Sequence, residues 1–471
     1  MFAIGACALV LSVPPAVPTA PAGIAVVARV PLTEPTDRVL IAPVAGMPVD
    51  DLRRALLAHN FQVVPGAGSD AFAVVGVPPG TNAHALAARI AQTVVVRNIE
   101  SDAVIRAMRE PNDPLYRSGQ ARYLEVIGAP RAWDRTTGGE GVLIAIIDSG
   151  IAWDQPDMRD RIFYNTRETP LSNVDADGNG CVGDIVGCNF VSLSTADPSC
   201  GYTVARPNWD TKDDEGHGTF VAGLAAAAGN NGIGVTGVAW QAKILPVKVL
   251  DCTATGRISD AAAGIRYAAR MGAHVINVSF GATTDSLVLR EAVEEAQARG
   301  AIIVASAGNE GQRAITYPAA YPGVISVAAS GRQGSDGIDY RSLAAFTNFG
   351  GVDVMAPGVN VLSTIPQLAC GNRGWVCLDG PYASASGSSF ATPIVAGAVA
   401  LMRAQHPDVS AAIIRALLID SRQPGTLPTD PGSLDIGAAL DRPLYREGVP
   451  GTSCATDLSN GSGVARGPVG Q

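Results

Sequence analysis

The sequence predicts an α/β protein with a mostly parallel central sheet and helices on both faces, preceded by a small α+β unit of ferredoxin-like order. Nearly continuous apolar runs, typical of strands buried on both faces, occur at residues 142–147, 242–249, 274–278, 301–305 and 324–328. Helix-like segments separate several of these runs, at residues 218–228, 259–271 and 286–299. The composition is 47% hydrophobic with 53 Gly and only 5% aromatic residues, which fits a compact α/β protein better than a disordered one.

The chain has 471 residues, which suits two or three units with a substantial buried interior. Its 34 basic and 43 acidic residues give a net charge of −9, so general binding to nucleic acid is not expected. No apolar run approaches the ~20 residues that span a bilayer, so we predict no transmembrane segment and no membrane partner.

The small unit is predicted from short alternating patterns over residues 38–108. Strands are expected at residues 39–41, 61–64, 71–77 and 93–96, with helices at residues 50–59 and after Asn82, a potential helix cap. This β-α-β-β-α-β order is ferredoxin-like. Residues 110–114 are rich in Pro and polar residues and are interpreted as an exposed linker. We therefore expect domains at residues 23–109 and 110–442, and a loosely held Gly/Ser/Pro-rich tail at 443–471.

The first 22 residues resemble a secretory signal peptide. A twelve-residue apolar stretch, residues 2–13, is followed by Pro14, Pro15 and small residues up to Ala22. No Lys or Arg precedes this stretch, and the alternative is an apolar N-terminal strand. We expect a secreted protein with residues 1–22 removed.

Eight cysteines stand at positions 7, 181, 188, 200, 252, 370, 377 and 454. Two pairs, Cys181/Cys188 and Cys370/Cys377, bracket Gly-containing sequence that could turn back on itself, and no His lies nearby to favour zinc. We expect two small-loop disulfides, which need an oxidising compartment, and a third pair between residues 200 and 252, which leaves Cys454 unpaired. Buried free thiols are the alternative.

Three short stretches place a reactive side chain beside glycine at the end of an apolar run. They contain Asp148 in Ala-Ile-Ile-Asp-Ser-Gly, His217 in Gly-His-Gly-Thr, and Ser389 in Gly-Ser-Ser-Phe-Ala-Thr-Pro. Ligands of open α/β sheets bind beyond the carboxyl ends of strands, and Pro393 indicates a helix N-terminus beneath Ser389. The three residues would supply a nucleophile, a base and an orienting carboxylate. Individually, each has an ordinary alternative as a loop cap, a structural His or a turn Ser.

Taken in order, these stretches resemble the motifs of subtilisin-like serine proteases (subtilases), over roughly residues 110–440. The resemblance implies that Asp148 orients His217 and that His217 takes the proton of Ser389 as it attacks. It also implies that Asn309, in Ala-Ser-Ala-Gly-Asn-Glu, donates its amide to the oxyanion. Two residues depart from the usual pattern: Phe390 stands where the family usually has Met, and Phe220 replaces a common His.

The same resemblance implies a proenzyme that acts on proteins and peptides. Residues 23–109 would be a propeptide that assists folding and inhibits the enzyme, and self-cleavage is expected near residues 109–113. We expect a monomer.

The resemblance also implies a groove in which an extended substrate pairs with the protein as an edge strand. The residues expected to line it are Ser279, Phe280, Gly281, Gly256, Ala307 and Gly308. The side-chain preference stays open, because small residues would admit large apolar side chains while Glu310 would admit basic ones.

Two calcium sites are predicted, both structural. Carboxylates and an amide alternate with glycines in one acidic loop, a pattern that suits hard cations, at Asp175, Asp177, Asn179 and Asp184. A solvated acidic loop is the alternative there. The family resemblance implies a second site made by Asn231, Ile233, Val235, Asp157 and Asp113.

Two other functions have weaker support in the sequence. A non-catalytic protein that holds peptides in the same groove would be favoured by degenerate triad residues, but all three are present. A nucleotide-binding protein would use the glycines of residues 229–234, yet that segment lacks the Lys of a phosphate loop.

Overall fold

The computed structural model describes residues 28–29, 37–102, 110–139, 141–169, 174–192, 197–201, 207–372, 374–427 and 430–442. The chain divides into two units, Met1–Ala107 and Met108–Gln471. The predicted signal peptide and tail lie outside the described residues, as do Cys7 and Cys454.

The small unit has the predicted β-α-β-β-α-β order, with one further short strand before it. Its elements are β1 (Ala28–Arg29), β2 (Arg38–Ala42), α1 (Val49–Ala58), β3 (Val63–Gly68), β4 (Ala73–Gly76), α2 (Ala83–Thr93) and β5 (Asn98–Ser101). The sheet order is β1-β5-β2-β4-β3, and the pairs β5–β2, β2–β4 and β4–β3 are antiparallel. Asn82 caps α2 by accepting from the backbone N–H of His84.

The strand predicted at residues 93–96 is wrong. Thr93 is the last residue of α2, and pairing with β2 begins only when Arg97 donates its N–H to Ala42 O at 2.9 Å. Val94 and Val96 are buried and Val95 is 44% exposed, so the segment alternates like a strand without lying in the sheet. The three β-branched residues Val94, Val95 and Val96 have the alternating pattern of a strand, although the strand itself begins at Asn98.

The large unit is built on an eight-stranded sheet. Its strands are β6 (Leu143–Asp148), β7 (Cys188–Asn189), β8 (Lys243–Lys248), β9 (Val275–Val278), β10 (Ile302–Ser306), β11 (Ile325–Gly334), β12 (Gly337–Leu343) and β13 (Val354–Pro357). The order is β12-β11-β10-β9-β6-β8-β7, with β13 also paired to β11. All of these pairs are parallel except β11–β12. Strands β14 (Val361–Thr364) and β15 (Tyr382–Ala385) form a separate antiparallel pair.

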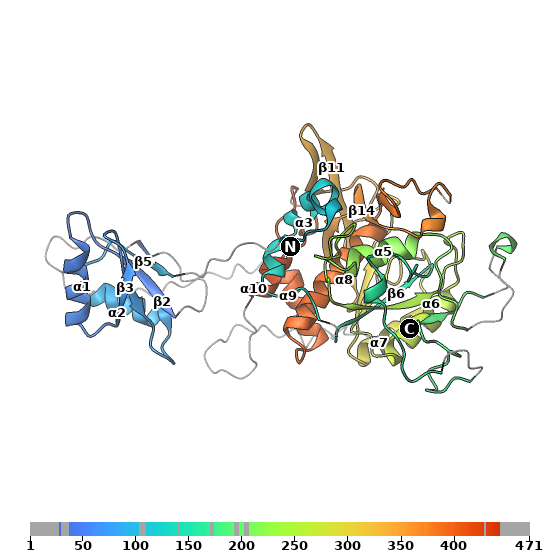
Figure 1. Cartoon of the computed structure of the whole chain (residues 1–471), viewed down its shortest axis with the longest axis horizontal. Coiled ribbons are helices and arrows are strands. Elements are labelled where there is room, and N and C mark those ends of the chain that lie inside the picture. The colour runs from blue at the N-terminus through green and yellow to red at the C-terminus, as the bar shows by residue number, and fades with distance from the viewer. Residues whose placement is uncertain are drawn as a thin grey trace, which may run out of the picture. The chain divides into compact units, whose positions relative to one another are not determined.

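Helices cover both faces of this sheet, as predicted (Figure 1). The α-helices are α3 (Ala121–Val126), α4 (Ala129–Trp133), α5 (His217–Ala226), α6 (Ile258–Arg270), α7 (Leu287–Ala298), α8 (Ser388–Gln405), α9 (Ala411–Asp420) and α10 (Ile436–Asp441). The chain also has a π-helical segment, η1 (Tyr116–Gln120), and single turns of 3₁₀-helix at η2 (Arg159–Arg161), η3 (Pro198–Cys200) and η4 (Gln367–Ala369). None of the helices among the described residues has the length and apolar character needed to cross a membrane.

The side chains of strand β6 contribute in turn to two hydrophobic clusters. Ile144 and Ile146 join the cluster that contains α5 and α8, whereas Ala145 and Ile147 join the cluster that contains α6 and α7. Side chains alternate between the faces of a strand, so a strand buried on both sides must be apolar throughout.

Three disulfides link Cys181–Cys188, Cys200–Cys252 and Cys370–Cys377. These are the two predicted small loops and the predicted third pair.

Helices α5 and α8 approach closely because glycine stands at their contact. A Cβ on Gly397 of α8 would lie 2.8 Å from Ala225 O in α5 and 2.6 Å from the Cβ of Val238. We expect Gly397→Ala to lower the free energy of unfolding by about 1–3 kcal/mol, the usual cost of overpacking. Denaturant titration measures this. Gly141→Ala is the matched control, since a Cβ there meets nothing within 4 Å, and equal losses for both variants would contradict the packing argument.

Candidate active site

The predicted reactive residues stand at the ends of elements that belong to the same sheet and its covering helices. Asp148 is the last residue of β6, and His217 is the first residue of α5. Asn309 follows β10, and Ser389 lies in the first turn of α8. Because β6 and β10 each pair in parallel with β9, their carboxyl ends meet at one edge of the sheet.

Asp148 and His217 are joined by a hydrogen bond of 2.8 Å between Oδ1 and Nδ1. Asp148 is completely buried, and its Oδ1 also accepts the N–H of Ser149 at 2.8 Å. A carboxylate at Nδ1 keeps the proton on that nitrogen, which leaves Nε2 of the neutral ring as an acceptor. The side chain of His217 is 18% exposed, so the ring remains accessible.

Carboxylates raise the pKa of His217. Burial alone would lower it, but the charge and hydrogen bond of Asp148, with Glu215 and Asp213 behind them, raise this pKa to about 9. Glu215 also fixes the backbone, because its Oε2 accepts the N–H of His217 at 2.6 Å. Burial raises the pKa of Glu215 and of Asp213.

A buried charged network lies behind this pair and was not predicted. Asp213 accepts from Ser149 Oγ at 2.9 Å and from Thr219 Oγ1 at 2.6 Å, so it ties the segment after β6 to the start of α5. Lys248, which is 1% exposed at the end of β8, donates to Asp214 at 2.8 Å and to the carbonyl oxygen of Ser149. The only signal in the sequence was a lysine at the end of a strongly apolar run.

Ser389 and Asn309 are brought together by the backbone that precedes Ser389. Asn309 Oδ1 accepts the N–H of Ser388 at 2.8 Å, and Nδ2 lies 3.8 Å from where a Cβ on Gly387 would stand. Its amide N–H groups are therefore presented beside the start of α8.

His217 reaches the same place through the residue after Ser389. The rings of His217 and Phe390 have centroids 5.3 Å apart. Within the described part of the chain, Ser389 Oγ makes no hydrogen bond to His217. Such contacts are commonly loose in a free enzyme and tighten when substrate binds.

The residues predicted to line a groove follow two neighbouring strands. Ser279, Phe280 and Gly281 come directly after β9, and Ala307 and Gly308 come directly after β10. Ser279 and Ala307 are buried, Phe280 is half-buried and Gly281 is exposed. Gly256 lies apart from these two strand ends, in the loop after β8, where it forms a β-bridge with Leu250.

The loop at residues 230–235 gathers the predicted ligands of one calcium site. Asp113 accepts the N–H groups of Asn230 at 2.7 Å and Asn231 at 3.2 Å. Asp157 accepts from the Asn231 side chain and from Val235 N, both at 3.1 Å. Both carboxylates are buried, and burial raises the pKa of each. Asp113 therefore anchors the segment that was predicted as an exposed linker.

These two carboxylates, Asp113 and Asp157, have no cationic partner in the described part of the chain. Among the described residues, neither forms an ion pair, and Asp157 feels the repulsion of Asp113 as well as its own burial. Ile233 donates its N–H to Asn231 Oδ1 at 2.8 Å, which holds the loop compact. A divalent cation bound by oxygen ligands fits this set of donors.

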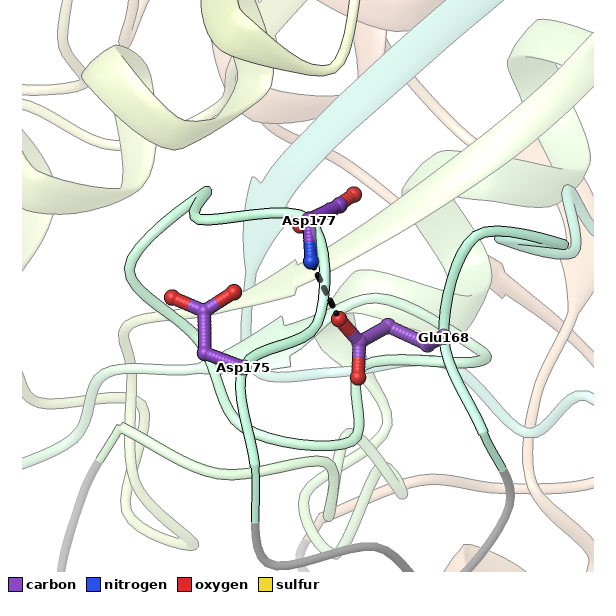
Figure 2. Close-up of side chains that lie close together, drawn as sticks. All are labelled: Glu168, Asp175 and Asp177. Carbon is purple, nitrogen blue, oxygen red and sulfur yellow. Dashed lines mark hydrogen bonds between the residues drawn. The ribbon is translucent and has the colours of Figure 1, made fainter.

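The second predicted calcium loop has a member that the sequence did not indicate. Figure 2 shows Glu168 pointing toward Asp175 and Asp177, and one carboxylate oxygen from each lies within 4.8 Å of the others. Glu168 Oε1 accepts the N–H groups of Ala176 at 2.7 Å and Asp177 at 3.1 Å. Its Oε2 is buried without a hydrogen-bond partner in the described structure, which favours a cation at this position.

Asn179 and Asp184 are turned to a neighbouring network. Asn179 Nδ2 donates to Asp184 Oδ2 at 2.8 Å, and the same carboxylate accepts from the hydroxyl of Tyr267. Burial raises the pKa of Asp184 to about 6. Of the four predicted ligands, Asp175 and Asp177 therefore lie together with Glu168, whereas Asp184 is bonded to Tyr267 of helix α6.

Comparison with known proteins shows the family to which this chain belongs. The model of the subtilase family matches residues 139–439. A thermophilic serine proteinase of Bacillus sp. AK1 is 34% identical over 69% of this chain and 67% of its own length. Thermitase of Thermoactinomyces vulgaris is 37% identical over 65% of this chain and 90% of its own.

A solved structure is also similar. It is a protease of Pseudoalteromonas arctica PAMC 21717, at 28% identity and a TM-score of 0.55, and the match covers 70% of this chain and 99% of that one. The family match spans all four predicted motifs, from Asp148 to Ser389. The chain therefore belongs to the subtilase family and is a subtilisin-like serine endopeptidase.

Proposed function

We propose that the protein hydrolyses peptide bonds with Ser389 as nucleophile, His217 as general base and Asp148 as the residue that orients His217. The observation that carries this proposal is the 2.8 Å hydrogen bond between buried Asp148 and His217 Nδ1. The bond leaves Nε2 as the acceptor for the Ser389 proton, and the nearby carboxylates stabilise the imidazolium that then forms. The His217 imidazolium returns this proton to the leaving amine.

The oxyanion would be held by Asn309 Nδ2 and the backbone N–H of Ser389. The bond from Ser388 N to Asn309 Oδ1 supports this role, because it turns the amide nitrogen toward the start of α8. Donors that are already positioned lose no orientational freedom when charge develops. In subtilisin itself, loss of the corresponding Asn lowers turnover by ~10²–10³, and a similar loss is expected here.

The substrate would be an extended segment of protein or peptide bound between the loops after β8, β9 and β10. Main-chain hydrogen bonds to residues 279–281 and 256 would hold it, with Ala307 and Gly308 at the main specificity pocket. The placement of residues 279–281 and 307–308 after the adjacent parallel strands β9 and β10 supports this groove.

Secretion and maturation complete the proposal. Residues 1–22 would be a signal peptide, residues 23–109 a propeptide that assists folding and inhibits, and 443–471 a tail, with a monomeric enzyme at 110–442. The separate small unit is compatible with a propeptide. The three disulfides support an oxidising compartment.

Calcium would brace two surface loops. Asp113, Asp157, Asn231 and the carbonyls of Ile233 and Val235 would hold one ion. Glu168, Asp175 and Asp177 would hold another, with Asn179 and Asp184 supporting that loop. Ca²⁺ contributes charge neutralisation here and no chemistry.

Ser389→Ala is expected to abolish both casein cleavage and labelling by a fluorophosphonate, because no other hydroxyl would be activated by His217. Wild-type protein, expressed in parallel, is the control and should do both. Labelling that persists in the variant would identify another nucleophile.

The rate constant kcat/KM for a small amide substrate is expected to rise with pH, with its inflection above the ordinary His pKa of about 6.5. The reason is that only neutral His217 accepts a proton, and carboxylates raise its pKa to about 9. Glu215→Gln removes one of these charges and should move the inflection to lower pH. Glu291→Gln is the control, since that residue pairs with Arg266. Equal inflections for the two variants would contradict the electrostatic argument.

Added Ca²⁺ is expected to slow heat inactivation, and EDTA to accelerate it. A ligand at 100 times its Kd stabilises the folded state by about 2.7 kcal/mol. Asp157→Asn and Glu168→Gln should each remove part of the Ca²⁺ effect, because they remove a buried carboxylate from different loops. If one variant keeps the full wild-type response, its loop binds no ion.

A further inference from the structure

We propose that Trp375, held in the disulfide loop Cys370–Cys377, is a positioning residue that aligns the His217 segment with the nucleophile helix α8. The inference rests on the proposed function of Ser389 and His217. It concerns a part of the chain to which the sequence analysis assigned no role in catalysis.

Trp375 lies directly on the backbone that precedes His217. A Cβ added to Gly216 would stand 2.5 Å from Trp375 Nε1 and 3.0 Å from its Cδ1, so the indole occupies the space of a side chain there. Gly216 has a φ of +122° and is the residue before the first turn of α5. The indole therefore limits how far the start of α5, which carries His217, can move.

The same indole bridges the two helices of the site through aromatic contacts. It stacks on Phe220 of α5 with centroids 5.2 Å apart and an interplanar angle of 27°, and it meets Phe390 of α8 edge-on at 6.4 Å. Phe220 and Phe390 lie 4.6 Å apart, and Phe390 touches the His217 ring at 5.3 Å. Offset or edge-on aromatic pairs stabilise a contact beyond what their buried area contributes.

This cluster explains two departures from the family pattern together. Phe220 and Phe390 replace a His and a Met in the motifs around His217 and Ser389, and both face the indole of Trp375. The three rings thus form one apolar wall that joins the base to the residue after the nucleophile.

The disulfide loop keeps Trp375 against this wall. The two cysteines close a loop, and their Cα atoms are 5.3 Å apart. Within this loop the backbone N–H of Trp375 donates to the carbonyl oxygen of Asn372 at 3.0 Å. Gly371 donates to Trp375 O at 3.1 Å. The neighbouring Val376 is 76% exposed, so the loop turns Trp375 inward and Val376 outward.

Trp375→Ala is expected to lower kcat by about 10- to 100-fold, because small displacements of a catalytic group cost up to about 10² in rate. KM for a p-nitroanilide substrate should stay within about 2-fold, since the proposal removes alignment and not binding. The rate of fluorophosphonate labelling should fall by the same factor as kcat. Trp375→Phe should restore most of the loss, and Val376→Ser, in the same loop, should match the wild type.

A second pair of variants tests the loop without altering the indole. Cys370→Ser/Cys377→Ser should reproduce the loss of kcat. Cys181→Ser/Cys188→Ser, which opens a disulfide of the same sequence separation of seven, should leave kcat unchanged. Thermal unfolding of every variant shows whether the molecule is folded at the assay temperature.

The outcomes separate the two proposals. A wild type that labels while Trp375→Ala labels equally fast overturns the role of Trp375 alone. A loss confined to substrates with residues beyond the scissile bond makes Trp375 a substrate contact and also overturns it. A loss in Trp375→Ala that Trp375→Phe does not restore, or that Val376→Ser shares, has the same consequence. A wild type that neither cleaves nor labels overturns the proposed function together with this inference.

Discussion

The close packing of α5 against α8 is the contact on which the site depends. Each helix carries a residue of the proposed machinery in its first turn: His217 is the first residue of α5, and Ser389 is the second residue of α8. Gly397 leaves no room for a side chain between α8 and the neighbouring Ala225 and Val238, so the distance between the helices is set by backbone contact. A close contact of this kind resists change in the distance between the helices, so it also restricts the relative movement of their first turns.

Charge around the site is arranged in two layers. Asp148 touches His217 directly, whereas Asp213 binds the backbone and hydroxyl groups of the segments that carry them. Lys248 adds a buried positive charge beside Asp214. Burial would make any of these groups costly alone, and the mutual hydrogen bonds offset that cost. The network therefore both orients the segments and holds negative charge close to His217.

The carboxylates of the surface loops differ from those of the active site in their surroundings. Asp113 and Glu168 are buried carboxylates that accept backbone N–H groups of the loops they close, whereas buried Asp157 accepts one backbone N–H together with the side chains of Asn231 and Tyr382. Backbone N–H groups satisfy oxygen lone pairs but leave the negative charge in place, so such loops gain from a divalent cation. Under the two proposals, these loops would protect against local unfolding, whereas the cluster of Phe220, Phe390 and Trp375 would align the catalytic groups.

Local pattern in the sequence determined five strands of the large sheet (β6, β8, β9, β10 and β11), the three helices α5, α6 and α7, and the four motifs that identify the family. Strands such as β6 are apolar throughout because both faces are buried, and that property is visible without a structure. Where the pattern was ambiguous, at Val94–Val96, pairing with β2 decided the outcome and the sequence misplaced the strand. The roles of Glu168, Lys248 and Trp375 could not be predicted from the sequence. Each role depends on contacts with another segment of the chain, which the fold brings close. Their contacts depend on how the chain folds back on itself, and only the tertiary structure decides that.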